Sequence, residues 1–110
     1  GISRGATLAL RIGFNHRTLF RKIGMHSFPM LIDESNRFAK AIGEIGKDER
    51  PELFLDVGDS DPEQYLARNF EHELAKLDIP HSWHLFSGSH DGAYWAENIA
   101  AYLKWYAQGW

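Results

Sequence analysis

Three short apolar runs are separated by longer segments with helical patterns. The apolar runs, at residues 22 to 27, 53 to 57 and 81 to 86, have the length and bounding residues of strands. Strands that alternate with helices indicate a parallel sheet covered by helices on both faces. We therefore predict an α/β protein with a three-layer α/β/α fold and a short parallel sheet of about three strands.

Four helices are expected around this sheet. The first runs from near Ser3 to about Asn15, and the third opens at Asp61 with Leu66, Phe70, Leu74 and Leu77 on its apolar side. The second extends from Asp33 to Gly46, with Asp33 or Ser35 as the N-cap and Gly46 at the C′ position. The last runs from about Ala93 to Ala107, and its predicted buried face is Trp95, Ile99, Tyr102, Leu103 and Tyr106.

Composition excludes several classes of function. A chain of 110 residues with 44% hydrophobic residues fits one globular domain, and a net charge of −3 with interspersed signs offers no basic face for nucleic acid. No apolar run reaches the roughly 18 residues that span a bilayer.

The absence of cysteine excludes a thiolate nucleophile, and the six histidines do not form a metal set, since His81 and His84 point to opposite faces of a strand. We expect no metal, cofactor, nucleic acid or membrane partner.

The first five residues, Gly1-Ile2-Ser3-Arg4-Gly5, have the pattern Gly-x-Ser-x-Gly. In α/β-hydrolases this pattern forms the nucleophile elbow, a tight turn that exposes the serine, and its glycines allow close passage of the turn and the following helix. The backbone N–H of Arg4, the residue after the serine, would then be one donor to the oxyanion. The alternative is an ordinary glycine-rich turn before a helix.

Three loops are expected at one edge of the sheet: one precedes the first helix, and two follow predicted strands. Each contains a side chain of a type found in catalytic triads. They are residues 1 to 5, 58 to 61 and 87 to 92, which supply Ser3, Asp61 and His90. Serine, acid and histidine in this order follow the α/β-hydrolase triad. Asp61 could instead be a helix N-cap, Asp59 is the alternative acid, and His90 could be an ordinary surface histidine.

Several segments also resemble a known family. They are Gly1 to Ala6 with Ala9-Leu10, Leu19 to Gly24 leading into His26-Ser27, Leu55 to Asp61, and Ser87 to Asp91 followed by Trp95. Together they resemble the C-terminal half of esterase D-like α/β-hydrolases, a family that includes S-formylglutathione hydrolases, feruloyl and acetylxylan esterases, siderophore esterases and mycolyltransferases. The family often has Gly-Gly after the serine, where this chain has Gly5-Ala6.

The resemblance implies a serine hydrolase that cleaves small-molecule carboxylic esters through an acyl-enzyme, with Ser3 as nucleophile, Asp61 as acid and His90 as base. It places His26 and Ser27 near the acyl pocket, although they could simply end a strand. It also implies that residues 1–110 are the C-terminal part of a hydrolase domain, beginning at the elbow. The expected partner is then the missing N-terminal half or a second copy of the chain.

Two other interpretations remain open. The chain could be a non-catalytic α/β binding module, or a hydrolase fragment that has the triad without turnover. The four tryptophans are interpreted as packing residues and not as a platform for sugar stacking: Trp83, Trp95, Trp105 and Trp110.

Overall fold

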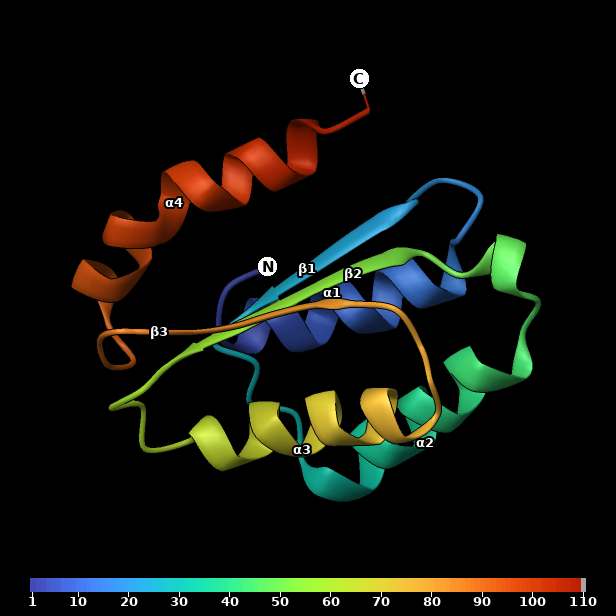
Figure 1. The fold of residues 1–110 in the computed structure, drawn as a ribbon, viewed down its shortest axis with the longest axis horizontal. Coiled ribbons are helices and arrows are strands. Elements are labelled where there is room, and N and C mark those ends of the chain that lie inside the picture. Colours follow the sequence, from blue (N-terminus) through green and yellow to red (C-terminus); the bar gives the residue numbers. More distant parts are fainter. Residues whose placement is uncertain (110) are drawn as a thin grey trace.

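The computed structural model describes residues 1–109 as a three-stranded parallel sheet between helices (Figure 1). The strand order is β1-β2-β3, so each crossover joins neighbouring strands. Trp110 lies outside the described residues. The elements are α1 (Arg4–Asn15), β1 (Lys22–His26), α2 (Ile32–Glu44), the short 3₁₀ helix η1 (Lys47–Glu49), β2 (Glu52–Gly58), α3 (Gln64–Lys76), β3 (Ser82–Phe86) and α4 (Gly92–Ala107).

The three strands are paired in a continuous parallel register. Met25 of β1 lies opposite Leu55 of β2, and Leu55 lies opposite Trp83 of β3. The central strand β2 is buried along almost its whole length, whereas β3 is half-exposed at the edge. At the other edge, Ile2 forms a parallel bridge with His26, which places the first residues beside the carboxyl end of β1.

Helices cover both faces of the sheet, which confirms the predicted three-layer class. In Figure 1, α1, α2 and α3 lie on one side of the strands and α4 lies alone on the other. The larger core lies on the three-helix side, because alternate residues of β1 and β2 point that way. It is built from Ala6, Leu10, Ile23, Met25, Phe28, Met30, Ala39, Ile42, Leu53, Leu55, Val57, Ala67, Phe70, Leu74 and Ile79.

The predicted buried face of α4 is partly wrong. Tyr102 and Trp105 pack against Phe54 of β2 as a second, smaller core. By contrast, Ile99 and Leu103 are 44% and 61% exposed. The helix carries apolar residues on most sides, so periodicity alone leaves its rotation open; aromatic contacts with the sheet decide it.

The predicted N-cap of α2 is also wrong. The helix begins at Ile32 with Leu31 as its N-cap and no side-chain cap, and it ends at Glu44. The backbone N–H of Ser35 already bonds to the carbonyl of Leu31, so Ser35 lies inside the first turn, where its side chain is buried. At the other end, Gly46 follows the C-cap Ile45 and so lies at the predicted C′ position, directly before η1. Of the four apolar residues predicted for the third helix, Leu66, Phe70 and Leu74 are buried in α3, whereas Leu77 follows the helix and is exposed.

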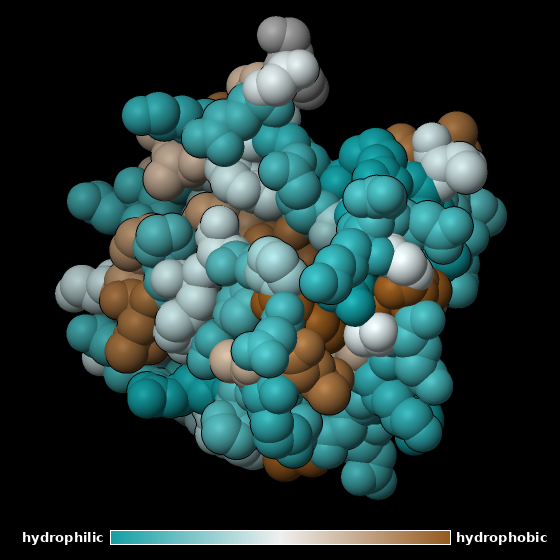
Figure 2. Space-filling view, turned by 45° about the vertical axis from the view of Figure 1, so that its right-hand side comes forward, coloured by the Kyte–Doolittle hydropathy of each residue, from teal (hydrophilic) through white to brown (hydrophobic). Residues whose placement is uncertain are grey.

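Apolar side chains reach the surface in several separate groups among hydrophilic residues on the face in Figure 2. Within residues 1–109, no helix combines the length and apolar character required to cross a bilayer. The exposed large hydrophobic residues include Leu8 and Ile12 of α1 and Leu19 and Phe20 before β1.

Candidate active site

Three side chains from separate loops are joined by hydrogen bonds at the carboxyl edge of the sheet. Ser3 Oγ lies 2.8 Å from Nε2 of His90, and Nδ1 of the same imidazole lies 2.7 Å from Oδ2 of Asp61. Ser3 precedes α1, Asp61 follows β2 and His90 follows β3. The structure therefore brings together the three residues selected from the sequence.

The backbone at Ser3 has an unusual conformation. Its φ of 56° and ψ of −124° lie in a region that non-glycine residues rarely adopt. Its N–H donates to the carbonyl of His26 at 2.8 Å, which fixes the turn to the end of β1. A serine at a helix N-cap usually accepts a bond from a backbone N–H of the first turn. Here the hydroxyl makes no cap hydrogen bond and faces His90.

The two glycines of the pattern differ in their steric roles. A Cβ on Gly1 would lie 2.1 Å from the carbonyl oxygen of Gly5, so the turn requires glycine at this position. A Cβ on Gly5 would have no heavy atom within 4 Å. The prediction that both glycines are needed for close passage is therefore correct for Gly1 only.

Gly58 brings the second and third loops together. A Cβ at this position would lie 2.3 Å from the carbonyl oxygen of Gly88. That carbonyl accepts the N–H of Ser60 at 2.8 Å, and the N–H of Asp59 bonds to the carbonyl of Phe86 at 2.8 Å. Backbone hydrogen bonds thus hold the loop with Asp61 against the loop with His90. Gly58 permits this close approach, and the sequence pattern does not predict that role.

Asp61 and Asp59 have different environments. Asp61 is buried, and its Oδ1 accepts the backbone N–H of Glu63 at 2.8 Å while Oδ2 faces His90. Its carboxylate thus closes an Asx turn before α3 and contacts the imidazole at the same time. Asp59 is exposed, and its Oδ1 accepts the N–H of Gly88 at 3.0 Å.

The hydrogen-bond partners define the tautomer of His90. An ionised carboxylate only accepts hydrogen bonds, so Nδ1 carries the proton and donates to Asp61. The unprotonated Nε2 then accepts the hydroxyl proton of Ser3. Since α1 begins at Arg4, the backbone N–H of Arg4 is one of the amides without a partner inside the helix. Such an amide can bind an anion that forms beside Ser3.

A cavity of about 600 Å³ opens beside Ser3, between α1 and the segment that leads into α2. Arg11 and Glu34 form a two-bond ion pair on its border, at 2.7 and 2.6 Å. The hydrogen bonds from Arg11 lower the pKa of the Glu34 carboxyl, so this pair stays charged. The lining residues are Ser3, Arg4, Thr7, Leu8, Arg11, Pro29, Met30, Leu31, Glu34 and Glu63.

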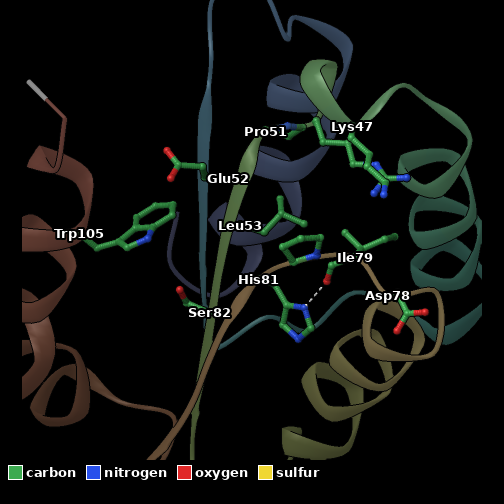
Figure 3. Close-up of a pocket in the computed structure, with 11 residues that line it drawn as sticks. Lys47, Pro51, Glu52, Leu53, Asp78, Ile79, His81, Ser82 and Trp105 are labelled. Atoms are coloured by element: carbon green, nitrogen blue, oxygen red, sulfur yellow. Dashed lines mark hydrogen bonds between the residues drawn. The ribbon is translucent and has the colours of Figure 1, made fainter.

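A second cavity, of about 450 Å³, lies at the amino ends of β2 and β3 (Figure 3). Glu52, Ser82 and Trp105 line it on one side, and Ile79 and His81 on another. The imidazole of His81 is already bonded to Glu71 and to the carbonyl of Ile79, each at 2.7 Å. This cavity is at the opposite end of the strands from Ser3 and shares no residue with the cavity there.

His26 and Ser27 do not line the cavity beside Ser3. The imidazole of His26 is buried and bonds through Nδ1 to Asp56 at 2.6 Å and through Nε2 to Tyr106 at 2.8 Å. The sequence pattern indicates for Asp56 only a position in a buried strand. A carboxylate inside an apolar run is a signal that a buried polar partner is needed, because an unpaired charge there is costly.

Within residues 1–109, no group of three or more His, Cys, Asp or Glu side chains is arranged to hold a metal ion. The residues that meet at the carboxyl edge can instead perform proton transfer from a hydroxyl to an imidazole, with a carboxylate behind it.

Comparison with solved structures gives the same fold. A ferulic acid esterase aligns with a TM-score of 0.78 and 21% identity over 96% of this chain and 48% of its own. S-formylglutathione hydrolase (FrmB) from Staphylococcus aureus aligns with a TM-score of 0.75 and 17% identity over 96% of this chain and 52% of its own. The chain thus spans about half the length of these structures, and its fold is of the α/β-hydrolase type. A comparison with curated proteins finds no matching relative. The family model described as "Putative esterase" matches residues 1–106, and the chain therefore belongs to this esterase family.

Proposed function

We propose that the chain carries the catalytic groups of a serine esterase that cleaves carboxylic esters through an acyl-enzyme. The observation that carries the proposal is the continuous set of hydrogen bonds from Ser3 Oγ through His90 to Asp61. Membership of an esterase family supports the same reaction class. The turn at Ser3 then acts as the nucleophile elbow, because its strained backbone presents the hydroxyl to His90.

The proposed reaction begins with proton transfer. Nε2 of His90 takes the Ser3 proton while Oγ attacks the ester carbonyl carbon, and Asp61 stabilises the imidazolium that forms. The backbone N–H of Arg4 donates to the developing oxyanion. The alkoxide then leaves with the proton from His90, and water, activated by the same imidazole, releases the acid from Ser3.

The cavity beside Ser3 is the proposed substrate site. Met30 and Leu31 give one wall an apolar surface, which suits the hydrocarbon part of an ester, and Arg4 stands at the border with the serine. The ion pair between Arg11 and Glu34 also lines this cavity.

The test is reaction with a serine-directed fluorophosphonate, followed by peptide mass spectrometry. We expect a mass shift on the peptide that contains Ser3, and no shift in Ser3→Ala. Ser87→Ala is the matched control, because Ser87 is an exposed serine in the same loop as His90 and should label like the unchanged protein. A folded sample without a label on Ser3 would favour the non-catalytic binding module.

A second candidate is a chain that holds the triad and turns over little by itself. The observation that favours it is that the chain spans only 48% and 52% of the two related structures. This candidate predicts labelling of Ser3 together with slow hydrolysis of p-nitrophenyl acetate. Hydrolysis should rise when the N-terminal half, the expected partner, is supplied as a separate polypeptide.

A further inference from the structure

Trp95 links the imidazole of His90 to the end of strand β1. It lies in the first turn of α4, and its ring meets the imidazole nearly at right angles, with an interplanar angle of 79° and 5.3 Å between ring centroids. Its indole N–H donates to the hydroxyl of Ser27 at 2.9 Å. The sequence predicts a packing role for Trp95, and these two contacts add a defined orientation of its ring.

Ser27 is a rigid anchor for the indole. Its side chain is buried, its φ is 57°, and its N–H donates to the carbonyl of Asp56 at 2.9 Å. The preceding residue, His26, accepts the N–H of Ser3 through its carbonyl at 2.8 Å. The backbone that holds Ser3 therefore also holds the hydroxyl that binds Trp95.

His90 needs such a support because its loop leaves it partly open. Its side chain is 23% exposed, and the two hydrogen bonds to Ser3 and Asp61 both lie in the plane of the ring. In-plane bonds tolerate tilting of an imidazole, whereas an aromatic ring set across it restricts that motion and gains an edge-to-face contact.

We propose that Trp95 is a positioning residue that keeps the imidazole of His90 aligned between Ser3 and Asp61, and that the hydrogen bond to Ser27 fixes the indole in the required orientation. The kinetic consequence rests on the proposed esterase function. The orientation of the His90 imidazole is independent of that function, so it can be measured separately.

The first measurement follows the proton on Nδ1 of His90 by ¹⁵N-edited NMR. A proton shared with a carboxylate and protected from water gives a resolved downfield signal. We expect the signal in the unchanged protein, and we expect Trp95→Phe and Ser27→Ala to broaden or remove it. Trp105→Phe, on the same helix but packed against Phe54, should keep it.

The second measurement is the rate at which a fluorophosphonate labels Ser3. Because a misplaced catalytic group costs rate without a loss of binding, Trp95→Phe should slow labelling about tenfold. The KM for p-nitrophenyl acetate should stay unchanged while kcat falls. Ser27→Ala should lower the rate in the same way, and the double variant should be no slower than the slower single variant, since both act through one hydrogen bond.

The outcomes separate the two claims. If the unchanged protein is folded but does not label, the proposed function fails and the NMR signal still tests the role of Trp95. An unaltered signal and labelling rate in folded Trp95→Phe would overturn the positioning role. If circular dichroism shows that Trp95→Phe is unfolded, Ser27→Ala tests the proposal in its place, because this substitution removes only the hydroxyl.

Discussion

His26 and Asp56 lie directly opposite each other on neighbouring strands, and a hydrogen bond of 2.6 Å joins Nδ1 of the imidazole to Oδ1 of the carboxylate. Both side chains are buried. The other carboxylate oxygen accepts the hydroxyl groups of Tyr94 and Tyr102, each at 2.5 Å. Burial and the nearby carboxylate raise the pKa of both tyrosines, so they remain donors. One carboxylate thus ties β1, β2 and α4 together.

The first prediction is that Asp56→Ala strongly destabilises the fold. The substitution leaves two hydroxyl groups and one imidazole N–H without their buried acceptor, and loss of a buried charged partner costs about 3–5 kcal/mol. The free energy of unfolding from urea titration should fall by this amount. Asp48→Ala, at an exposed position in η1, should change it by less than about 0.5 kcal/mol. Equal losses in the two variants would contradict the role of Asp56.

The second prediction concerns stability in acid. Burial lowers the pKa of His26, although the Asp56 carboxylate acts in the opposite direction. In the unfolded chain a histidine binds a proton below about pH 6.5, while in the folded protein the lowered pKa moves protonation of His26 to lower pH. The unfolded state therefore binds more protons, and stability that is present above about pH 6.5 falls as the pH decreases, by at most about 1.4 kcal/mol per unit from this group.

Urea titrations at pH 7.5 and 5.5 measure this effect. His26→Asn keeps a donor toward Asp56 and removes the titrating ring, so the difference between the two pH values should shrink. His72→Gln, an exposed histidine on α3, should leave the difference as it is in the unchanged protein. The interpretation fails if both variants behave alike.

The positions of Ser3, Asp61 and His90 could be predicted because each depends on chain order and on local pattern. Parallel strands place their carboxyl ends at one edge, so the loops that follow β2 and β3 must lie near the turn before α1. The strand and helix segments follow from the spacing of apolar residues, and their observed bounds differ from the predicted ones by only a few residues.

The contacts between distant segments could not be predicted in this way. The partners of Asp56 on α4 lie 38 and 46 residues further along the chain. Helical periodicity predicts a buried face of α4 that contains Ile99 and Leu103. In the structure the hydroxyl of Tyr94 reaches Asp56, and this rotation of the helix leaves Ile99 and Leu103 exposed. The close approach of Gly58 to the carbonyl of Gly88 arises from backbone packing between two loops, so no local sequence pattern predicts it.

The third prediction follows from that close approach. Gly58→Ala places a Cβ 2.3 Å from the Gly88 carbonyl oxygen, and neither a Cβ nor a backbone carbonyl can move away by a change of rotamer. The two loops must separate, which should destabilise the protein by about 1–3 kcal/mol and slow labelling of Ser3, because Asp61 and His90 move apart. Gly46→Ala, where a Cβ meets open space, is the matched control for thermal unfolding and labelling. A variant at Gly58 with normal labelling would show that the loops are not coupled.

The fourth prediction distinguishes the two candidate acids. Asp61→Asn preserves the carbonyl oxygen that accepts the N–H of Glu63, so the fold should persist. The amide NH₂ would donate to Nδ1 of His90 and move the imidazole proton to Nε2, where it can no longer accept the proton of Ser3. Labelling and ester hydrolysis should therefore fall by about a thousandfold or more at neutral pH.

Asp59→Asn is the matched substitution two residues earlier. Its Oδ1 accepts the N–H of Gly88, and an asparagine oxygen can do the same, so labelling should stay within about twofold of the unchanged protein. If Asp59→Asn loses activity and Asp61→Asn keeps it, the acid is Asp59 and the hydrogen bond between Asp61 and His90 serves only the fold. If neither changes labelling, the imidazole acts without a carboxylate, and the proposed triad reduces to a serine and a histidine.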